Sequence, residues 1–175
     1  MRFSVDPVFS LLAIAALALL FGSAALAKLR DRARFTAVLE AYDVLPAPMA
    51  RILAVGLPFM ELAVAIGLFV TQFRPVAAGT AGALLLIYGA GIAWNLARGR
   101  RDIDCGCEGF GQRRPIAPWM LVRNAILIGV AAVAGAVPTA RPVVLTDVLT
   151  IAGGLAVFVL IYFAADRLLA PRALA

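Results

Sequence analysis

The chain has 175 residues, of which 63% are hydrophobic and 15% are charged, and its mean hydropathy is +0.97. Soluble domains are about 45–50% apolar, so this composition excludes an ordinary water-soluble enzyme and is typical of a helical bundle solvated by lipid. The net charge of +6 does not indicate nucleic-acid binding, because no basic face is interleaved with aromatic side chains that could stack on bases. The absence of histidine excludes haem sites, metal sites and acid–base catalysis that depend on imidazole.

Long apolar segments follow one another along the chain. Residues 8–27 carry no charge, and such a segment is long enough to cross a hydrocarbon core of about 30 Å. Four further segments are apolar apart from a few polar residues, and the last of them is the shortest, which leaves four spans as the alternative to five. We predict an all-α, polytopic transmembrane bundle that forms one domain over residues 1–175, with spans at about 8–28, 49–71, 76–97, 117–137 and 147–166 and a loop at 98–116.

The first apolar segment has a second interpretation, a secretory signal peptide. Ala25-Leu26-Ala27 resembles a signal-peptidase site that follows an apolar region. The apolar region is long for a signal peptide, however, and Arg2 alone supports a basic region before it. We therefore favour a membrane span.

Residues 31–45, between the first two spans, have the periodicity of an amphipathic helix. Apolar residues recur at helical spacing, and most charged residues fall elsewhere. This pattern predicts a short helix lying in the membrane interface, which ends before Pro46 and Pro48. Its apolar residues are Phe35, Val38, Leu39, Tyr42 and Leu45.

Most positive charges gather toward one side of the predicted bundle. Twelve of the 16 Lys and Arg residues belong to one side. Five lie at positions 28–51, around the connection between the first two spans, five lie in the 98–116 loop, and two follow the last span. The positive-inside rule therefore predicts an N-terminus outside and both long loops, with the C-terminus, in the cytoplasm.

The 98–116 loop contains both cysteines of the chain, Cys105 and Cys107, separated by Gly106. The glycine allows the backbone to bend so that the two sulfurs can meet, and a disulfide over so short a loop is strained and easily reduced. The pattern favours a redox-active dithiol. Two alternatives stay open: a pair that binds a soft metal such as Cu(I), Hg or Zn, and two ordinary loop thiols. A closed tetrahedral zinc site is not available from these residues of one chain.

Polar residues inside the predicted spans suggest a second functional feature. Glu61 lies near the middle of the second span, and Arg123 and Asn124 lie in the fourth, where polar groups are costly and therefore point to function. Lys28 and Asn95 lie toward the side that carries the cysteines. We predict a polar cluster beneath the cysteine loop, in which Glu61 pairs with a buried cation. The alternative is hydrogen bonding that only holds the helices together.

Two motifs occur together around the cysteine loop, Ile103-Asp104-Cys105-Gly106-Cys107 and Leu121-Val122-Arg123-Asn124. With Ala27-Lys28-Leu29, the segment 35–46, and Pro58 with Glu61, they resemble the methylamine utilisation protein MauE family of DoxX-like membrane proteins. The resemblance covers most of the chain and implies a multi-pass protein of the bacterial inner membrane.

The resemblance also implies a role in methylamine metabolism. Proteins of this kind support maturation of the small subunit of methylamine dehydrogenase, a periplasmic protein rich in disulfides, together with a membrane-anchored thioredoxin-like partner. Cys105 and Cys107 would then alternate between dithiol and disulfide, with Arg123, Asn124 and Glu61 in support. Because the chain has no second cysteine pair, the electrons would pass to a partner or to a quinone, which is the candidate cofactor. The alternative is a membrane transport or docking protein that binds a soft metal or has no redox turnover.

The charge bias and the resemblance disagree about the side of the membrane. The charge bias places the cysteine loop in the cytoplasm, whereas the implied client is periplasmic. Either the loop dips into the bundle, or the protein moves reducing equivalents outward, or the true orientation is the reverse. The sequence does not choose among these three.

Overall fold

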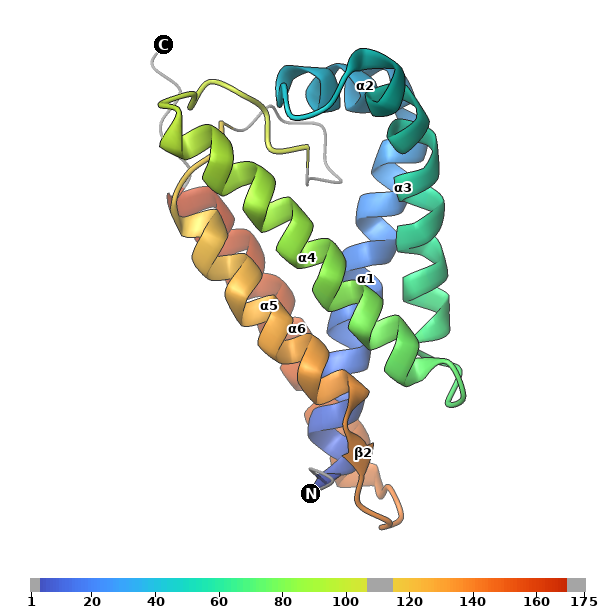
Figure 1. Cartoon of the computed structure of the whole chain (residues 1–175). Coiled ribbons are helices and arrows are strands. Elements are labelled where there is room, and N and C mark those ends of the chain that lie inside the picture. The colour runs from blue at the N-terminus through green and yellow to red at the C-terminus, as the bar shows by residue number, and fades with distance from the viewer. Residues whose placement is uncertain (1–3, 107–114, 170–175) are drawn as a thin grey trace.

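The structure is a computed structural model that describes residues 4–106 and 115–169. Its helices, with two short strands, form a bundle (Figure 1). The predicted all-α fold is therefore confirmed, and the two strands of two residues each do not change the class. The elements are β1 (Ser4–Val5), α1 (Pro7–Arg30), α2 (Arg32–Ala41), α3 (Ala47–Gly67), α4 (Arg74–Ala97), α5 (Trp119–Gly135), β2 (Val137–Pro138) and α6 (Leu145–Leu169).

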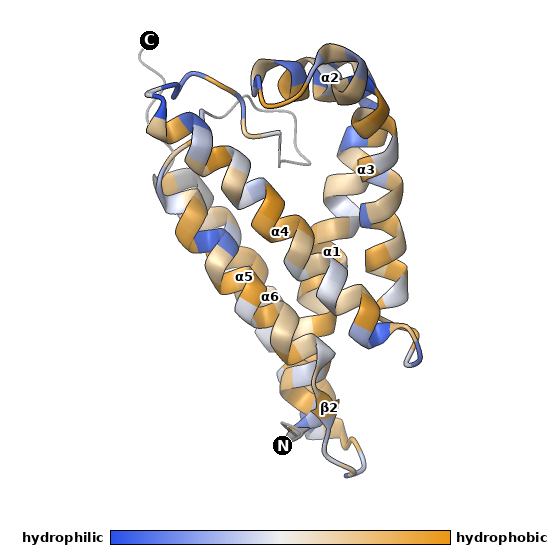
Figure 2. Cartoon of the chain, viewed as in Figure 1, coloured by the Kyte–Doolittle hydropathy of each residue, from blue (hydrophilic) through white to orange (hydrophobic). Residues whose placement is uncertain are grey.

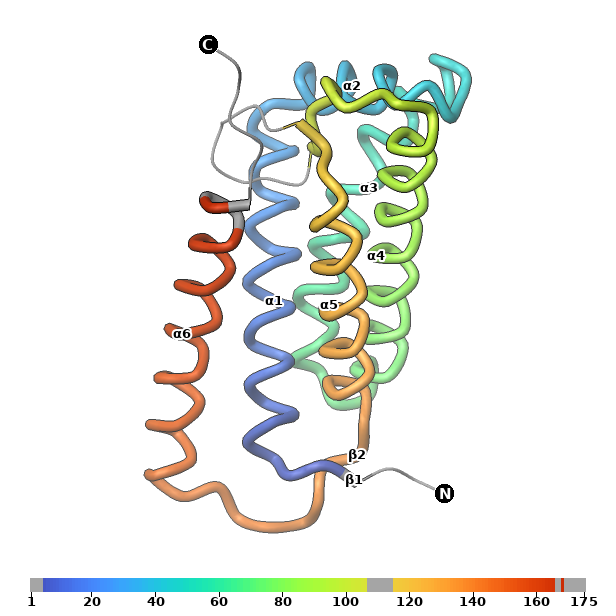
Figure 3. Tube along the Cα trace, turned by 90° about the vertical axis from the view of Figure 1, so that its left-hand side faces the viewer, coloured from blue at the N-terminus to red at the C-terminus, as the bar shows by residue number. Residues whose placement is uncertain are grey.

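Helix α1 is the centre of the bundle. It packs against α3, α5 and α6, and α4 completes the layer by packing on α5 and α3 (Figure 3). The main hydrophobic core lies along α1, where Leu17 and Phe21 are at most 2% exposed. Helix α6 is the outermost helix, and none of its residues from Leu145 to Ala165 is buried. Its attachment therefore depends on its contacts with α1 and on a few polar contacts.

The amphipathic helix is present as α2, which lies across one end of the bundle (Figure 1). The Asp31 side chain begins it by accepting a hydrogen bond from the Arg34 N–H at 3.0 Å, as an N-cap residue does. Phe35 and Val38 are buried on its inner face, as their spacing predicts. Leu45 is 37% exposed, because the helix ends at Ala41 and the chain turns before Leu45.

Large apolar side chains cover the outside of the bundle, and polar residues gather mainly toward its ends (Figure 2). Ile52, Val76 and Leu160 are each at least 68% exposed, which a water-soluble protein would avoid on this scale. Among the described residues, four helices are long and apolar enough to cross a membrane, namely α1, α3, α4 and α6, while α5 is a shorter apolar helix of 17 residues. The chain is a membrane protein, and the number of spans stays a prediction between four and five.

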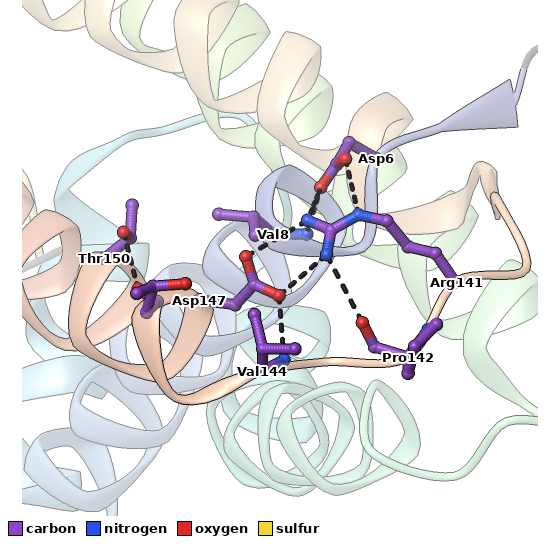
Figure 4. Close-up of polar contacts among 8 residues, drawn as sticks. Asp6, Val8, Arg141, Pro142, Val144, Asp147 and Thr150 are labelled. Atoms are coloured by element: carbon purple, nitrogen blue, oxygen red, sulfur yellow. Dashed lines mark hydrogen bonds and ion pairs between the residues drawn. The ribbon is translucent and has the colours of Figure 1, made fainter.

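The end of the bundle opposite α2 is held by a small polar junction. Strand β1 pairs in parallel with β2, and next to it Arg141 bonds two carboxylates (Figure 4). Arg141 donates to both oxygens of Asp6 at 2.8 and 2.9 Å and to both oxygens of Asp147 at 2.7 and 3.1 Å. This junction joins the start of α1 to the start of α6, so it tethers the outermost helix.

Candidate functional site

Backbone hydrogen bonding joins the residues just before the cysteines to the residues just before α5. Asp104 and Pro115 form an isolated antiparallel bridge, and the Ile116 N–H donates to the Ile103 carbonyl at 3.0 Å. The two ends of the loop are therefore fixed side by side, next to the start of α5. Cys107, the second member of the predicted redox pair, lies outside the described residues.

Cys105 lies inside the end of the bundle rather than on an open surface. It is 6% exposed and belongs to a small hydrophobic cluster with Ile92, Ile116 and Met120. The Tyr42 hydroxyl donates to its carbonyl oxygen at 3.3 Å. The backbone at Cys105 is thus held from α2 and its side chain from α4 and α5.

Gly106 follows Cys105 in a conformation that favours glycine. Its φ is +67°, in the left-handed region that residues with a Cβ rarely adopt. A Cβ at this position would also lie 2.7 Å from Cγ1 of Val38, so the backbone approaches α2 more closely than any other residue would allow. The glycine between the cysteines is needed for the bend and for this contact.

Polar contacts hold α2 against the cysteine segment. Arg34 donates to the Asp104 carboxylate at 2.7 Å, and Asn95 at the end of α4 donates to the Tyr42 carbonyl at 3.1 Å. Asn95 is fully buried, and Arg100 donates to its side-chain oxygen at 3.3 Å. Asn95 therefore positions Tyr42, and Tyr42 in turn holds the Cys105 carbonyl.

Sequence reasoning singled out Asn95 and Cys105 but missed Tyr42 and Arg34 as their supports. The spacing of residues 31–45 places Tyr42 only on the apolar face of the amphipathic helix, although a covered tyrosine hydroxyl requires a hydrogen-bond partner. The Arg34–Asp104 pair joins residues 70 positions apart, and no local pattern signals such a contact.

A second polar cluster lies within the helices. The Lys28 ammonium group donates to Oε1 of Glu61, and the Tyr88 hydroxyl donates to the same oxygen at 2.7 Å. Lys28 and Glu61 are 6% and 1% exposed, and the ammonium group also lies 5.0 Å from the ring centres of Phe35 and Tyr88. The predicted pairing of Glu61 with a buried cation is confirmed, and the cation is Lys28.

Arg123 and Asn124 lie beside this cluster on α5. The Arg123 guanidinium is 5.2 Å from the Trp119 ring centre and donates to the Tyr162 hydroxyl at 3.2 Å. Asn124 is 4% exposed and donates to the Leu85 carbonyl at 3.3 Å. Both residues line one cavity with Lys28 and Glu61.

The structure therefore divides the predicted polar residues into two groups. Asn95 acts near the cysteine segment, through Tyr42, whereas Glu61, Arg123 and Asn124 surround the cavity. The link between the groups is Trp119, which packs against the cluster that contains Cys105 and carries Arg123 on its ring. A role of Arg123 in cysteine chemistry stays a prediction.

These features define a class: a helical membrane protein in which the segment ending at Gly106 packs on a short helix at one end of the bundle, with a buried ion pair between the helices. The sequence model of the family described as methylamine utilisation protein MauE matches residues 6–137. The chain belongs to the methylamine utilisation protein MauE family, and α6 lies beyond the matched residues.

Curated relatives agree with this assignment. The chain is 44% identical to methylamine utilization protein MauE of Paracoccus denitrificans over 155 residues, which is 87% of this chain and 82% of that protein. It is 40% identical to the protein of the same name from Paracoccus versutus, over the same shares of the two chains. It is 35% identical to that of Methylophilus methylotrophus over 92% of this chain and 86% of the relative. No solved structure matches the chain.

Proposed function

We propose that this protein is a membrane thiol–disulfide factor that supports maturation of the disulfide-rich small subunit of methylamine dehydrogenase. The observation that carries the proposal is the way the chain holds Cys105. Its backbone is fixed by the bridge at Asp104 and by Tyr42, and the glycine that follows brings the chain tightly onto α2. Such restraint costs conformational entropy, which a pair of inert loop thiols would not require.

In the proposed reaction, the pair acts as an oxidant of the client. A client thiolate attacks the Cys105–Cys107 disulfide to give a mixed disulfide, and a second client thiolate then displaces it. The client gains one disulfide and the protein becomes a dithiol. Two electrons pass from client to protein, and the two protons lost by the client thiols end on the two protein thiols, directly or through water. A disulfide of a thioredoxin-like partner, or a quinone in the bilayer, would accept those electrons and restore the pair.

Burial of Cys105 does not by itself reconcile the charge bias with a periplasmic client, because the residue still lies at the charge-rich end of the bundle. The side chain packs among residues of α4 and α5, so this part of the loop dips into the end of the bundle. We propose an inner-membrane protein, and direct attack by a periplasmic client requires the charge-rich end to face the periplasm, the reverse of the orientation that the charge bias predicts. Labelling of single cysteines placed at Arg32 and at Thr139 with a membrane-impermeant reagent would test the orientation, since these positions lie at opposite ends.

The redox proposal is tested by denaturing the purified protein, so that the buried Cys105 becomes accessible, and alkylating it before and after reduction. We expect two thiols to become available only after reduction, and we expect Cys105→Ser and Cys107→Ser each to leave one thiol that reacts without reductant. Gly106→Ala should reduce the fraction of protein that forms the Cys105–Cys107 disulfide, because the added Cβ meets Val38 and the backbone conformation is strained. Two thiols that react equally with and without reductant, after oxidant has been added, would contradict the proposal.

The same preparation distinguishes the alternative. Stoichiometric copper or zinc bound by the reduced pair, without disulfide formation, would favour a soft-metal site. The client is tested separately, in a methylamine-utilising strain whose own gene is replaced by the Cys105→Ser form. We expect the methylamine dehydrogenase small subunit to accumulate with free thiols or to be degraded. A subunit with all its disulfides would remove the client from the proposal.

A further inference from the structure

A cavity of about 30 Å³ lies among the helices, next to the buried ion pair. Polar side chains from five helices line part of it, and apolar side chains such as Phe21 and Leu85 form the rest. The polar lining residues are Lys28, Glu61, Tyr88, Arg123, Asn124 and Tyr162. Each of the helices α1, α3, α4, α5 and α6 contributes at least one of them.

Glu61 has one satisfied and one unsatisfied oxygen in this cavity. Lys28 and Tyr88 both donate to Oε1, whereas Oε2 is buried and accepts no hydrogen bond from any described residue. An unpaired buried acceptor of a charged group is energetically costly, and a bound water molecule commonly supplies the missing hydrogen bond. The unsatisfied oxygen belongs to a side chain that is 1% exposed and lines the cavity. This lack of a partner indicates that a ligand binds in the cavity.

The size of the cavity fits water rather than a larger ligand. A buried water molecule needs about 10–15 Å³ of accessible space and two to four polar partners. The cavity provides that space for one or two molecules, and its lining includes Glu61 with the donors Arg123 and Asn124 of α5 and Tyr162 of α6. Walls made only of Phe21 and Leu85 would leave the cavity dry, so the carboxylate is the group that holds water.

We propose that this cavity is a water-binding site in which one or two water molecules hydrogen-bond to Oε2 of Glu61 and join it to the polar groups of α5 and α6. The water completes a hydrogen-bonded network across these five helices. Its other neighbours in the cavity wall include Lys28, Tyr88, Arg123 and Tyr162. The water site does not involve the cysteines, so its test is independent of the thiol proposal.

X-ray radiolytic footprinting of the full chain in lipid nanodiscs tests the proposal, because bound water yields hydroxyl radicals that label adjacent side chains. We expect Tyr88 to be labelled several-fold faster than Phe59, which is 52% exposed toward the lipid. Labelling of Tyr88 that is no faster than that of Phe59 would overturn the proposal.

A filled cavity provides the matched comparison. Ala24→Leu places a larger side chain in the cavity wall, and Ala125→Leu makes the same change on the exposed face of α5. We expect the fast labelling of Tyr88 to be lost in the first variant and kept in the second. If Ala24→Leu does not fold, the double variant Lys28→Met/Glu61→Leu removes the carboxylate without stranding the lysine, and it should lose the label as well. If Tyr88 is still labelled fast in a folded Ala24→Leu or Lys28→Met/Glu61→Leu variant, the radicals come from elsewhere and the proposal is overturned.

Discussion

The two ionic clusters of the molecule differ in almost every physical respect. Arg141 with Asp6 and Asp147 lies at the end of the bundle, where Arg141 and Asp6 are 36% and 40% exposed. Lys28 with Glu61 lies between the helices, where the two side chains are 6% and 1% exposed. The outer cluster has the more complete geometry, with four hydrogen bonds from one guanidinium to two carboxylates, whereas the inner cluster leaves a carboxylate oxygen unsatisfied.

The comparison shows that the ion pair with the more complete hydrogen bonding need not be the one that contributes more to stability. Water and salt screen an exposed pair, so even a well-formed one contributes little. A buried pair is weakly screened, and removing one partner strands a charge in a medium of low dielectric constant. We therefore expect the inner cluster to control stability and the outer cluster to act as a tether for α6.

The largest effect is expected from breaking the inner pair. Lys28→Met or Glu61→Leu alone should lower the free energy of unfolding by about 3–5 kcal/mol, because the remaining charge is buried without its partner. The double variant Lys28→Met/Glu61→Leu should recover most of that loss. Denaturant titration in bicelles measures the free energies. A double variant that is as unstable as the sum of the two singles would show that the residues act independently.

A smaller effect is expected from Tyr88→Phe, which removes the hydrogen bond to Oε1 of Glu61 and leaves the ring in place. Hydrogen bonds to charged groups contribute about 1.5–3 kcal/mol, so the free energy of unfolding should fall by that order. The same titration applies. Loss of stability should disappear when Tyr88→Phe is added to the Lys28→Met/Glu61→Leu background, where the hydroxyl has no carboxylate to bond.

A still smaller effect is expected at the outer cluster. Arg141→Ala should lower the melting temperature slightly at low salt, and the difference from the wild type should shrink near 1 M salt, where the Debye length is about 3 Å. Arg141→Lys should behave almost like the alanine variant, because an ammonium group cannot bond two carboxylates in the forked geometry. A fall in the melting temperature of Arg141→Ala that is the same at low and high salt would show that salt does not screen the cluster.

The smallest effect is a dependence on pH at the outer cluster. Hydrogen bonds from Arg141 and from the Val8 backbone hold the pKa of Asp6 below its usual value of 3.8. Because the pKa is lowered on folding, the stabilisation is fully present above the unfolded pKa and is lost as pH falls through the folded one. Arg141 lowers the pKa of Asp147 in the same way. The melting temperatures of wild type and Arg141→Ala should therefore differ at pH 6 and converge as the pH falls from 3.8 through the lowered pKa values of the two aspartates. A difference that stays constant over this range would exclude Asp6 as the cause.

Much of the fold could be predicted from the sequence because its main signals are local. Apolar segments long enough for helices, prolines at their starts, and the spacing of Phe35 and Val38 each depend on a few neighbouring residues. The end of α2 at Ala41 was less predictable, since Leu45 continues the apolar spacing but lies beyond the turn.

The candidate site was predictable only in part. Cys105, Glu61 and Arg123 were identifiable because a cysteine pair and intramembrane polar groups are unusual wherever they occur. Their partners were not, because Tyr42, Tyr88 and Tyr162 have the same local patterns as ordinary aromatic residues of an apolar helix. Cys107 was singled out by the motif and lies outside the described residues.

The sequence by itself determined that lipid surrounds this chain, since hydrophobic composition acts residue by residue and needs no knowledge of packing. It also determined where helices begin and which loop carries the sulfurs. The tertiary structure alone decided the pairings, which join residues 33 positions apart in Lys28–Glu61, 70 apart in Arg34–Asp104 and 135 apart in Asp6–Arg141. Such contacts depend on how whole helices pack and rotate against one another, and that is a property of all the helices together.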